Sequence, residues 1–95
     1  MGKTQTRPWD AAEHLDSEED MAAYLEAALE DKDPSVFLLA LRQVVQARGM
    51  ANVARKAHVG RESLYKTLSE NGNPELRTIN RLLHAMGLRL SVTAG

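Results

Sequence analysis

Apolar side chains recur at helical spacing over most of this chain, beginning near residue 17. From there to residue 29 they fall three and four positions apart, at Met21, Tyr24, Leu25, Ala28 and Leu29. This spacing predicts an amphipathic helix with one buried face. Ser17 and Asp20 have the spacing of a capping box, with Asp in place of the usual Glu, which predicts a helix start at Ser17. Residues 31–33 end this helix.

A second helix is predicted to begin at the pair Asp33-Pro34. Asp33 can cap it, and Pro34 suits the first helical position because its missing N–H would have no partner there. Gly49 predicts the end of this helix, since glycine readily adopts the backbone conformation of a helix C-terminus. The expected buried face consists of Phe37, Ala40, Leu41, Val44 and Val45, widened by Leu38 and Leu39.

Residues 50–68 predict two short helices, about 51–57 and 61–69, joined by a tight turn. Ala54 stands where the helices cross closely, so that only a small side chain fits. Val59, Leu64 and Leu68 are expected to face inward. The outward face of the second helix is expected to hold Arg61, Glu62, Tyr65 and Lys66. This layout is that of a helix-turn-helix, which lays one helix across the DNA backbone and places the next in the major groove.

The remaining pattern predicts a loop over residues 71–74, a last helix and a strand. The last helix has its apolar face at Leu76, Ile79, Leu82, Leu83 and Met86, and Gly87 ends it. Residues 88–93 alternate apolar and polar residues and include β-branched ones, which is typical of a strand. We therefore expect an all-α fold of five helices with one C-terminal β-strand that has no strand partner within the monomer.

The chain divides into three parts. Residues 1–33 are expected to form a flexible arm, a short turn from Asp10 through His14 and Leu15, and an acidic helical extension. Residues 34–87 form the helix-turn-helix domain. Residues 88–95 hold the strand, whose unpaired edge favours pairing with a second chain, so a homodimer is expected. The side chains on the dimerisation face are Leu88, Leu90 and Val92.

Composition narrows the class of protein. Ninety-five residues suit one domain with a small core. The chain lacks cysteine, which excludes disulfides and thiolate metal sites and fits a reducing cytoplasm. No apolar run approaches the roughly 20 residues of a membrane span, and the N-terminus lacks the apolar core of a signal peptide. We expect a soluble cytoplasmic protein without a membrane partner.

Charge is divided unevenly along the chain. Residues 1–33 hold three Lys or Arg against ten Asp or Glu, whereas residues 34–95 hold nine against three. This asymmetry favours two faces with different partners, one of which is a polyanion. The alternative is that the charged helices are simply well solvated.

Enzymatic chemistry finds little support in the sequence. His14, His58 and His84 lie far apart and lack the spacing of metal ligands. Ser63 is not part of a nucleophile elbow, and the 71–73 loop has one glycine and no following lysine, unlike a phosphate-binding loop. We expect neither an enzyme nor a bound metal or cofactor.

The outward face of residues 61–69 has the chemistry of DNA recognition. Arg61 can bond O6 and N7 of guanine, Glu62 can accept from cytosine N4, and Lys66 can reach guanine or a phosphate. Tyr65 can bond a phosphate or pack on a sugar or a thymine methyl. Contacts to the DNA backbone are expected from three further cations: Arg55, Lys56 and Arg77. The competing interpretation is an ordinary solvated helical hairpin.

Several segments resemble one family. They are residues 16–20 with Tyr24-Leu25, residues 47–50, the run RESLYK at 61–66 ahead of GNP at 72–74, and residues 87–92. Through them residues 9–93 resemble the probable addiction-module antidote proteins, small HigA-like antitoxins of the lambda-repressor-like (XRE) class encoded beside a RelE-type toxin. The RESLYK run ahead of GNP is specific to this group, whereas the Ala54–Leu64 spacing belongs to all helix-turn-helix proteins.

The resemblance implies a DNA-reading helix at 61–69 and a toxin that is neutralised by direct binding. The chain departs from the family pattern at Ala51, where Ser or Thr often begins a helix, and at Gly60, where serine usually caps the next one. His58 stands where the turn usually has glycine, so it is strained if its φ is positive.

The expected function is therefore that of an antitoxin in a type II toxin–antitoxin pair, which binds a RelE-like toxin and represses its own operon at a double-stranded DNA operator. RelE-like toxins carry basic surfaces, so toxin contact is expected from Glu18, Glu19, Asp20, Glu26 and Glu30. Two alternatives stay open: a stand-alone repressor without a toxin, and a toxin-binding interaction protein with a vestigial DNA motif. A small basic reading frame beside this gene would favour the antitoxin.

Overall fold

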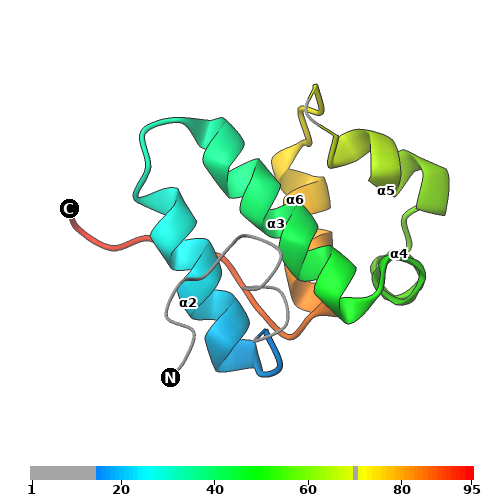
Figure 1. The fold of residues 1–95 in the computed structure, drawn as a ribbon, viewed down its shortest axis with the longest axis horizontal. Coiled ribbons are helices and arrows are strands. Elements are labelled where there is room, and N and C mark those ends of the chain that lie inside the picture. Colours follow the sequence, from blue (N-terminus) through cyan, green and yellow to red (C-terminus); the bar gives the residue numbers. More distant parts are fainter. Residues whose placement is uncertain (1–14, 70) are drawn as a thin grey trace, which may run out of the picture.

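The computed structural model of the chain describes residues 15–69 and 71–95, and the fold within them is all-helical. The helices are α2 (Glu18–Leu29), α3 (Pro34–Arg48), α4 (Met50–Ala57), α5 (Arg61–Thr67) and α6 (Leu76–Ala85). In Figure 1, α2 and α3 lie next to each other, α4 and α5 lie on the opposite side of α3 from α2, and α6 is seen behind α3. The prediction of five helices is confirmed for the described residues.

The first two of these helices begin at side chains that satisfy free backbone N–H groups. The Ser17 hydroxyl accepts a hydrogen bond from the Asp20 N–H at 3.0 Å, and the Asp33 carboxylate accepts one from the Ser35 N–H at 3.0 Å. The backbone N–H of Ser35, followed by its hydroxyl, holds the pKa of Asp33 below its ordinary value, because both bonds favour the charged carboxylate. Both predicted caps are confirmed, although α2 itself begins at Glu18.

A single apolar core joins the five helices. α2 packs on α3, while α4 contacts α3, α5 and α6. The buried residues are Leu15, Met21, Leu25, Ala28, Ala40, Leu41, Val44, Val45, Val53, Ala54, Ala57, Leu64, Leu68, Leu82, Leu83 and Met86. Most of the predicted apolar positions are therefore buried, and the acidic extension shares its core with the rest of the chain.

Three leucines on the predicted apolar faces are nevertheless exposed. Leu76 is 64% exposed at the start of α6. Leu29 is 53% exposed at the end of α2, and Leu39 is 44% exposed in α3. Phe37 and Leu38 are only half-buried. Periodicity predicts the side of a helix that can be buried, but the neighbouring helices decide how wide a stripe they cover. The prediction that Leu29, Leu39 and Leu76 are buried is wrong for that reason.

The C-terminal segment also differs from the prediction. Residues 88–95 form no strand in the structure and follow an extended path from the end of α6 past α2 (Figure 1). Leu88 is held, because its N–H donates to the Leu83 carbonyl at 2.8 Å and its side chain is half-buried. Leu90 and Val92 are 37% and 96% exposed. A strand requires a neighbour with which to exchange backbone hydrogen bonds, and the described monomer offers this segment none.

The N-terminal predictions fall mainly outside the described residues. The arm and the turn from Asp10 to His14 lie there, whereas Leu15 is described and is 5% exposed in the core. Across residues 15–69 and 71–95, no helix has both the length and the apolar character needed to cross a membrane.

The backbone is left-handed at one residue other than glycine in the described chain. His58 ends α4 with φ 58° and ψ 44°. The sequence predicted strain at this position if φ were positive, and the structure confirms the positive φ. Gly49, which ends α3 at φ 98°, has no side chain to be strained. The left-handed region places the Cβ of His58 close to its neighbouring carbonyl oxygen.

Replacing His58 with glycine is therefore expected to stabilise the fold. The gain in the free energy of unfolding should be about 0.5–1 kcal/mol, because relief of the strained Cβ is partly offset by the greater freedom of glycine in the unfolded chain. Urea denaturation of the two proteins measures this difference. The matched control is His84→Gly in α6, where the backbone is helical and glycine should cost about 1 kcal/mol. A loss of stability in His58→Gly would contradict the argument.

Candidate nucleic-acid interface

The turn between α4 and α5 consists of residues 58–60. After the left-handed His58, the Val59 N–H donates to the Ala54 carbonyl at 3.0 Å, which closes the end of α4. Gly60 is the N-cap residue of α5, and neither α4 nor α5 begins with a side-chain cap. Tertiary packing must therefore hold both short helices in place, since seven or eight residues do not form a stable helix alone.

That packing uses small side chains on α4, Leu64 of α5 and Leu68, the residue that ends α5. Ala54 and Ala57 are 3% and 4% exposed, so α4 turns small side chains toward the core. Leu64 and Leu68 are buried at 0% and 1% exposure, and Val59 is half-buried. The inward side of α5 is thus fixed in the core, and its opposite side faces solvent.

The solvent-facing side of α5 holds the residues that the sequence predicted there. All four are exposed: Arg61, Glu62, Tyr65 and Lys66. The Arg61 guanidinium carbon lies 6.0 Å from the centre of the Tyr65 ring, at the outer limit of a cation–π contact. The two residues are one helical turn apart, so the structure brings together side chains that the sequence treated as separate contacts.

On α4, Arg55 and Lys56 are both exposed, and Arg55 is held in place. Its Nη2 donates to the Asn52 Oδ1 at 2.6 Å, across one turn of the helix. Sequence reasoning missed Asn52, although its spacing of three residues from Arg55 is a signal for such a pair. The bond restricts the guanidinium of Arg55, which makes it a positioned cation at the edge of the exposed face.

Further basic groups lie on α6. Arg77 is exposed in the first turn of this helix, after the 71–74 loop. Arg81 and His84 line a shallow hollow with Lys56 and His58 from the end of α4. Arg81 was not among the predicted contacts, although its spacing of four residues from Arg77 places both on one side of α6. The cations of residues 55–84 thus come from three different helices.

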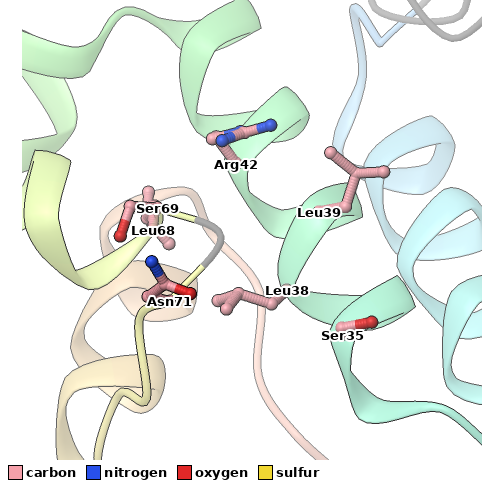
Figure 2. Close-up of a pocket in the computed structure, with 7 residues that line it drawn as sticks. All are labelled: Ser35, Leu38, Leu39, Arg42, Leu68, Ser69 and Asn71. Atoms are coloured by element: carbon pink, nitrogen blue, oxygen red, sulfur yellow. The ribbon is translucent and has the colours of Figure 1, made fainter.

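A second hollow lies where α3 meets the end of α5 and the following loop (Figure 2). It is lined by Ser35, Leu38, Leu39, Arg42, Leu68, Ser69 and Asn71. In Figure 2, Leu38 points across the hollow toward Asn71 and Leu68, and Leu39 points away from them. The Ser69 hydroxyl donates to the Lys66 carbonyl at 2.8 Å, so it caps the end of α5. This hydroxyl therefore has a structural role at the end of α5.

The acidic candidates on α2 form two groups. Glu18, Glu19 and Asp20 are exposed in the first turn, where negative charge stabilises the positive end of the helix dipole. Glu26 and Glu30 are exposed one turn apart near the other end, where the dipole favours cations instead. The first group therefore has a local structural role, and the second has none that the fold explains.

The acidic helix is fixed to the rest of the chain by polar contacts as well as by the core. The Tyr24 hydroxyl donates to Oε1 of Gln43 on α3, and burial raises the pKa of Tyr24. Arg48 Nη1 donates to the Asp16 carbonyl at 3.4 Å. The acidic face of α2 and the basic face of α4 and α5 are therefore parts of one packed unit.

In the described part of the chain, no three His, Asp or Glu side chains are close enough to form a metal site. The described surface instead presents a short helix, α5, with an exposed cationic and aromatic face, which packs on the core and is flanked by cations from α4 and α6. The other distinct surface is the acidic helix α2.

Comparison with known proteins identifies the family. A family model described as "Probable addiction module antidote protein" matches residues 5–94. The chain belongs to this family. The antidote assignment implies the role of an antitoxin with a toxin as partner. A protein from Haemophilus influenzae, described as uncharacterized, is 40% identical over 88 residues, which cover 93% of this chain and 91% of the relative. No solved structure matches the chain.

Proposed function

We propose that this antidote protein is the antitoxin of a type II toxin–antitoxin module that binds a RelE-like toxin and represses its own operon. In this proposal α4 and α5 form a helix-turn-helix of the HigA-like, lambda-repressor-like class. The observation that best supports this proposal is the amphipathic character of α5, which buries Leu64 in the core and exposes Arg61, Tyr65 and Lys66. It acts by binding rather than by catalysis, in the cytoplasm.

DNA recognition follows from the chemistry of the exposed face of α5. Arg61 bonds O6 and N7 of guanine, Glu62 accepts from cytosine N4, and Lys66 reaches guanine or a phosphate. The ring of Tyr65 supports the Arg61 guanidinium, which reduces the freedom that Arg61 loses on binding. The flanking cations neutralise the DNA backbone: Arg55, which Asn52 holds, with Lys56 and Arg77.

Toxin binding is assigned to α2, on the opposite side of α3 from α4 and α5 (Figure 1). Its acidic face suits a toxin with a basic surface, because opposite potentials speed association and restrict the choice of partner. Glu26 and Glu30 are the strongest candidates, because no structural role in the monomer accounts for them. Glu18, Glu19 and Asp20 add to the same negative potential.

A homodimer is part of the proposal because helix-turn-helix readers bind paired half-sites about 34 Å apart. The segment 88–95 suits this role. Leu90 and Val92 are exposed, and the segment follows an extended path without a strand partner in the monomer. Two such segments that pair across a two-fold axis would satisfy each other's backbone groups and bury Val92.

Substitutions on α5 test the repressor. Arg61→Ala is expected to cost about 1–3 kcal/mol in operator binding and to relax specificity at one base position. Lys66→Ala should weaken binding and, where it meets a phosphate, reduce the salt slope by about one unit. Electrophoretic shifts on the upstream promoter fragment at several salt concentrations measure both effects.

The control is Lys32→Ala, in the acidic segment, which should leave the salt dependence of promoter binding unchanged. Failure of the wild-type protein to prefer the promoter at low salt, with or without toxin, would contradict the repressor.

Charge reversal on α2 tests the toxin face. The double variant Glu26→Lys and Glu30→Lys is expected to lower the association rate with the co-expressed neighbouring toxin about tenfold at low salt, because it removes the attracting potential. Surface plasmon resonance at two salt concentrations measures this rate. Glu62→Lys on α5 is the matched reversal on the other face and should have little effect. An unchanged rate in the double variant would mean that these carboxylates only solvate the helix.

Truncation tests the dimer. Removal of residues 88–95 is expected to produce monomers that bind the operator more weakly, because the spacing between two recognition helices is no longer fixed. Sedimentation velocity and the promoter shift assay measure the two effects. A truncated protein that still sediments as a dimer would place the interface elsewhere, on the N-terminal helices.

A further inference from the structure

A groove lies between α2 and the C-terminal segment, and part of its apolar lining is exposed to solvent. Leu25 and Leu29 of α2 form one wall, Leu90 lies on the other, and Phe37 of α3 and Leu83 of α6 also line it. Leu29 and Leu90 are 53% and 37% exposed, and both stand among the large exposed apolar residues of the described chain. Exposed apolar side chains that gather at one hollow indicate a contact surface.

The charges around this groove are mainly negative. Glu26 belongs to the lining, and Glu30, the C-cap residue of α2, follows it one turn later. α2 contains no Lys or Arg, and its C-terminal carbonyls add the negative end of the helix dipole close to Leu29. Arg89, in the opposite wall, is the one cation among the described lining residues. A nucleic acid would be repelled by this surface, whereas a basic protein segment would be attracted.

The combination of apolar wall and acidic rim selects a particular kind of segment. The aliphatic stem of a Lys or Arg can lie on Leu29 while its charged end reaches the Glu26 or Glu30 carboxylate. A neighbouring apolar side chain of the same segment can then fill the hollow between Leu29 and Leu90. Such a segment is basic and amphipathic, and it is complementary to the groove in both charge and polarity.

We propose that this groove is the docking site for the toxin and that a basic amphipathic segment of the toxin occupies it. The proposal rests on the antitoxin function and adds to it an apolar anchor beside the acidic helix. It separates two contributions to binding. The carboxylates govern the salt-sensitive association rate, while burial of Leu29 and Leu90 governs the dissociation rate, which salt screens little.

The test uses the full chain and the product of the adjacent reading frame, co-expressed with an affinity tag. Leu29→Arg is expected to weaken toxin binding at least tenfold through faster dissociation, and the loss should persist at about 0.5 M salt. The matched control is Leu76→Arg at the start of α6, where an even more exposed leucine (64%) lies outside the groove and the same substitution should have no effect. Circular dichroism confirms that both variants fold, and the promoter shift assay should find Leu29→Arg unchanged in operator binding.

The outcomes separate this proposal from the function on which it rests. Wild-type protein that captures no toxin would overturn both. Capture by wild type together with equal affinities for Leu29→Arg and Leu76→Arg would overturn the groove and leave the antitoxin role standing. A Leu29→Arg protein that becomes monomeric but still binds toxin would show that a second copy of the chain covers the groove, which also overturns the proposal.

Discussion

The close approach of α4 to three other helices is the constraint on which this fold depends. α4 contacts α3, α5 and α6, and it buries Val53, Ala54 and Ala57, of which two carry only a methyl group. Because these side chains are small, the axis of α4 can lie close to those of its neighbours. Larger side chains of the neighbouring helices then fill the core around α4. Leu64 of α5 and Leu82 of α6 are each fully buried in this core. A larger side chain at Ala54, which is 3% exposed, would find little free space in this core and would displace α4 from its neighbours.

The same constraint positions the candidate DNA-binding face. α5 has seven residues, no side-chain cap and one buried residue within its bounds, so its conformation in isolation would be unstable. Its attachment through Leu64, Leu68 and the Val59–Ala54 hydrogen bond is what turns Arg61 and Lys66 outward on a rigid support. The strained backbone of His58 lies in the same turn. The local sequence thus favours helix formation least in α5 and the turn before it, where we propose that DNA is recognised. Packing against the core supplies the missing stability.

The division of charge between the two halves of the chain has a spatial counterpart. α2 carries acids without a single base, and α4, α5 and α6 carry exposed cations. Tyr24, Gln43 and the shared core join α2 to α3, so the opposite potentials belong to one compact body. In the proposed function this separation has a clear use, because a basic toxin and a polyanionic operator would each be attracted to one face and repelled from the other.

The sequence alone determined the features that depend on near neighbours along the chain. Ser17 and Asp33 cap their helices, Gly49 ends α3, and the inward and outward sides of α5 follow from helical periodicity, because caps and turns involve residues a few positions apart.

Only the tertiary structure decided the features that require distant segments to meet. Leu29 and Leu39 lie on apolar stripes but stay exposed, since burial needs a covering neighbour. Residues 88–95 alternate like a strand yet form none, since a strand needs a partner. The groove between α2 and this segment arises from residues more than fifty positions apart, which periodicity cannot bring together.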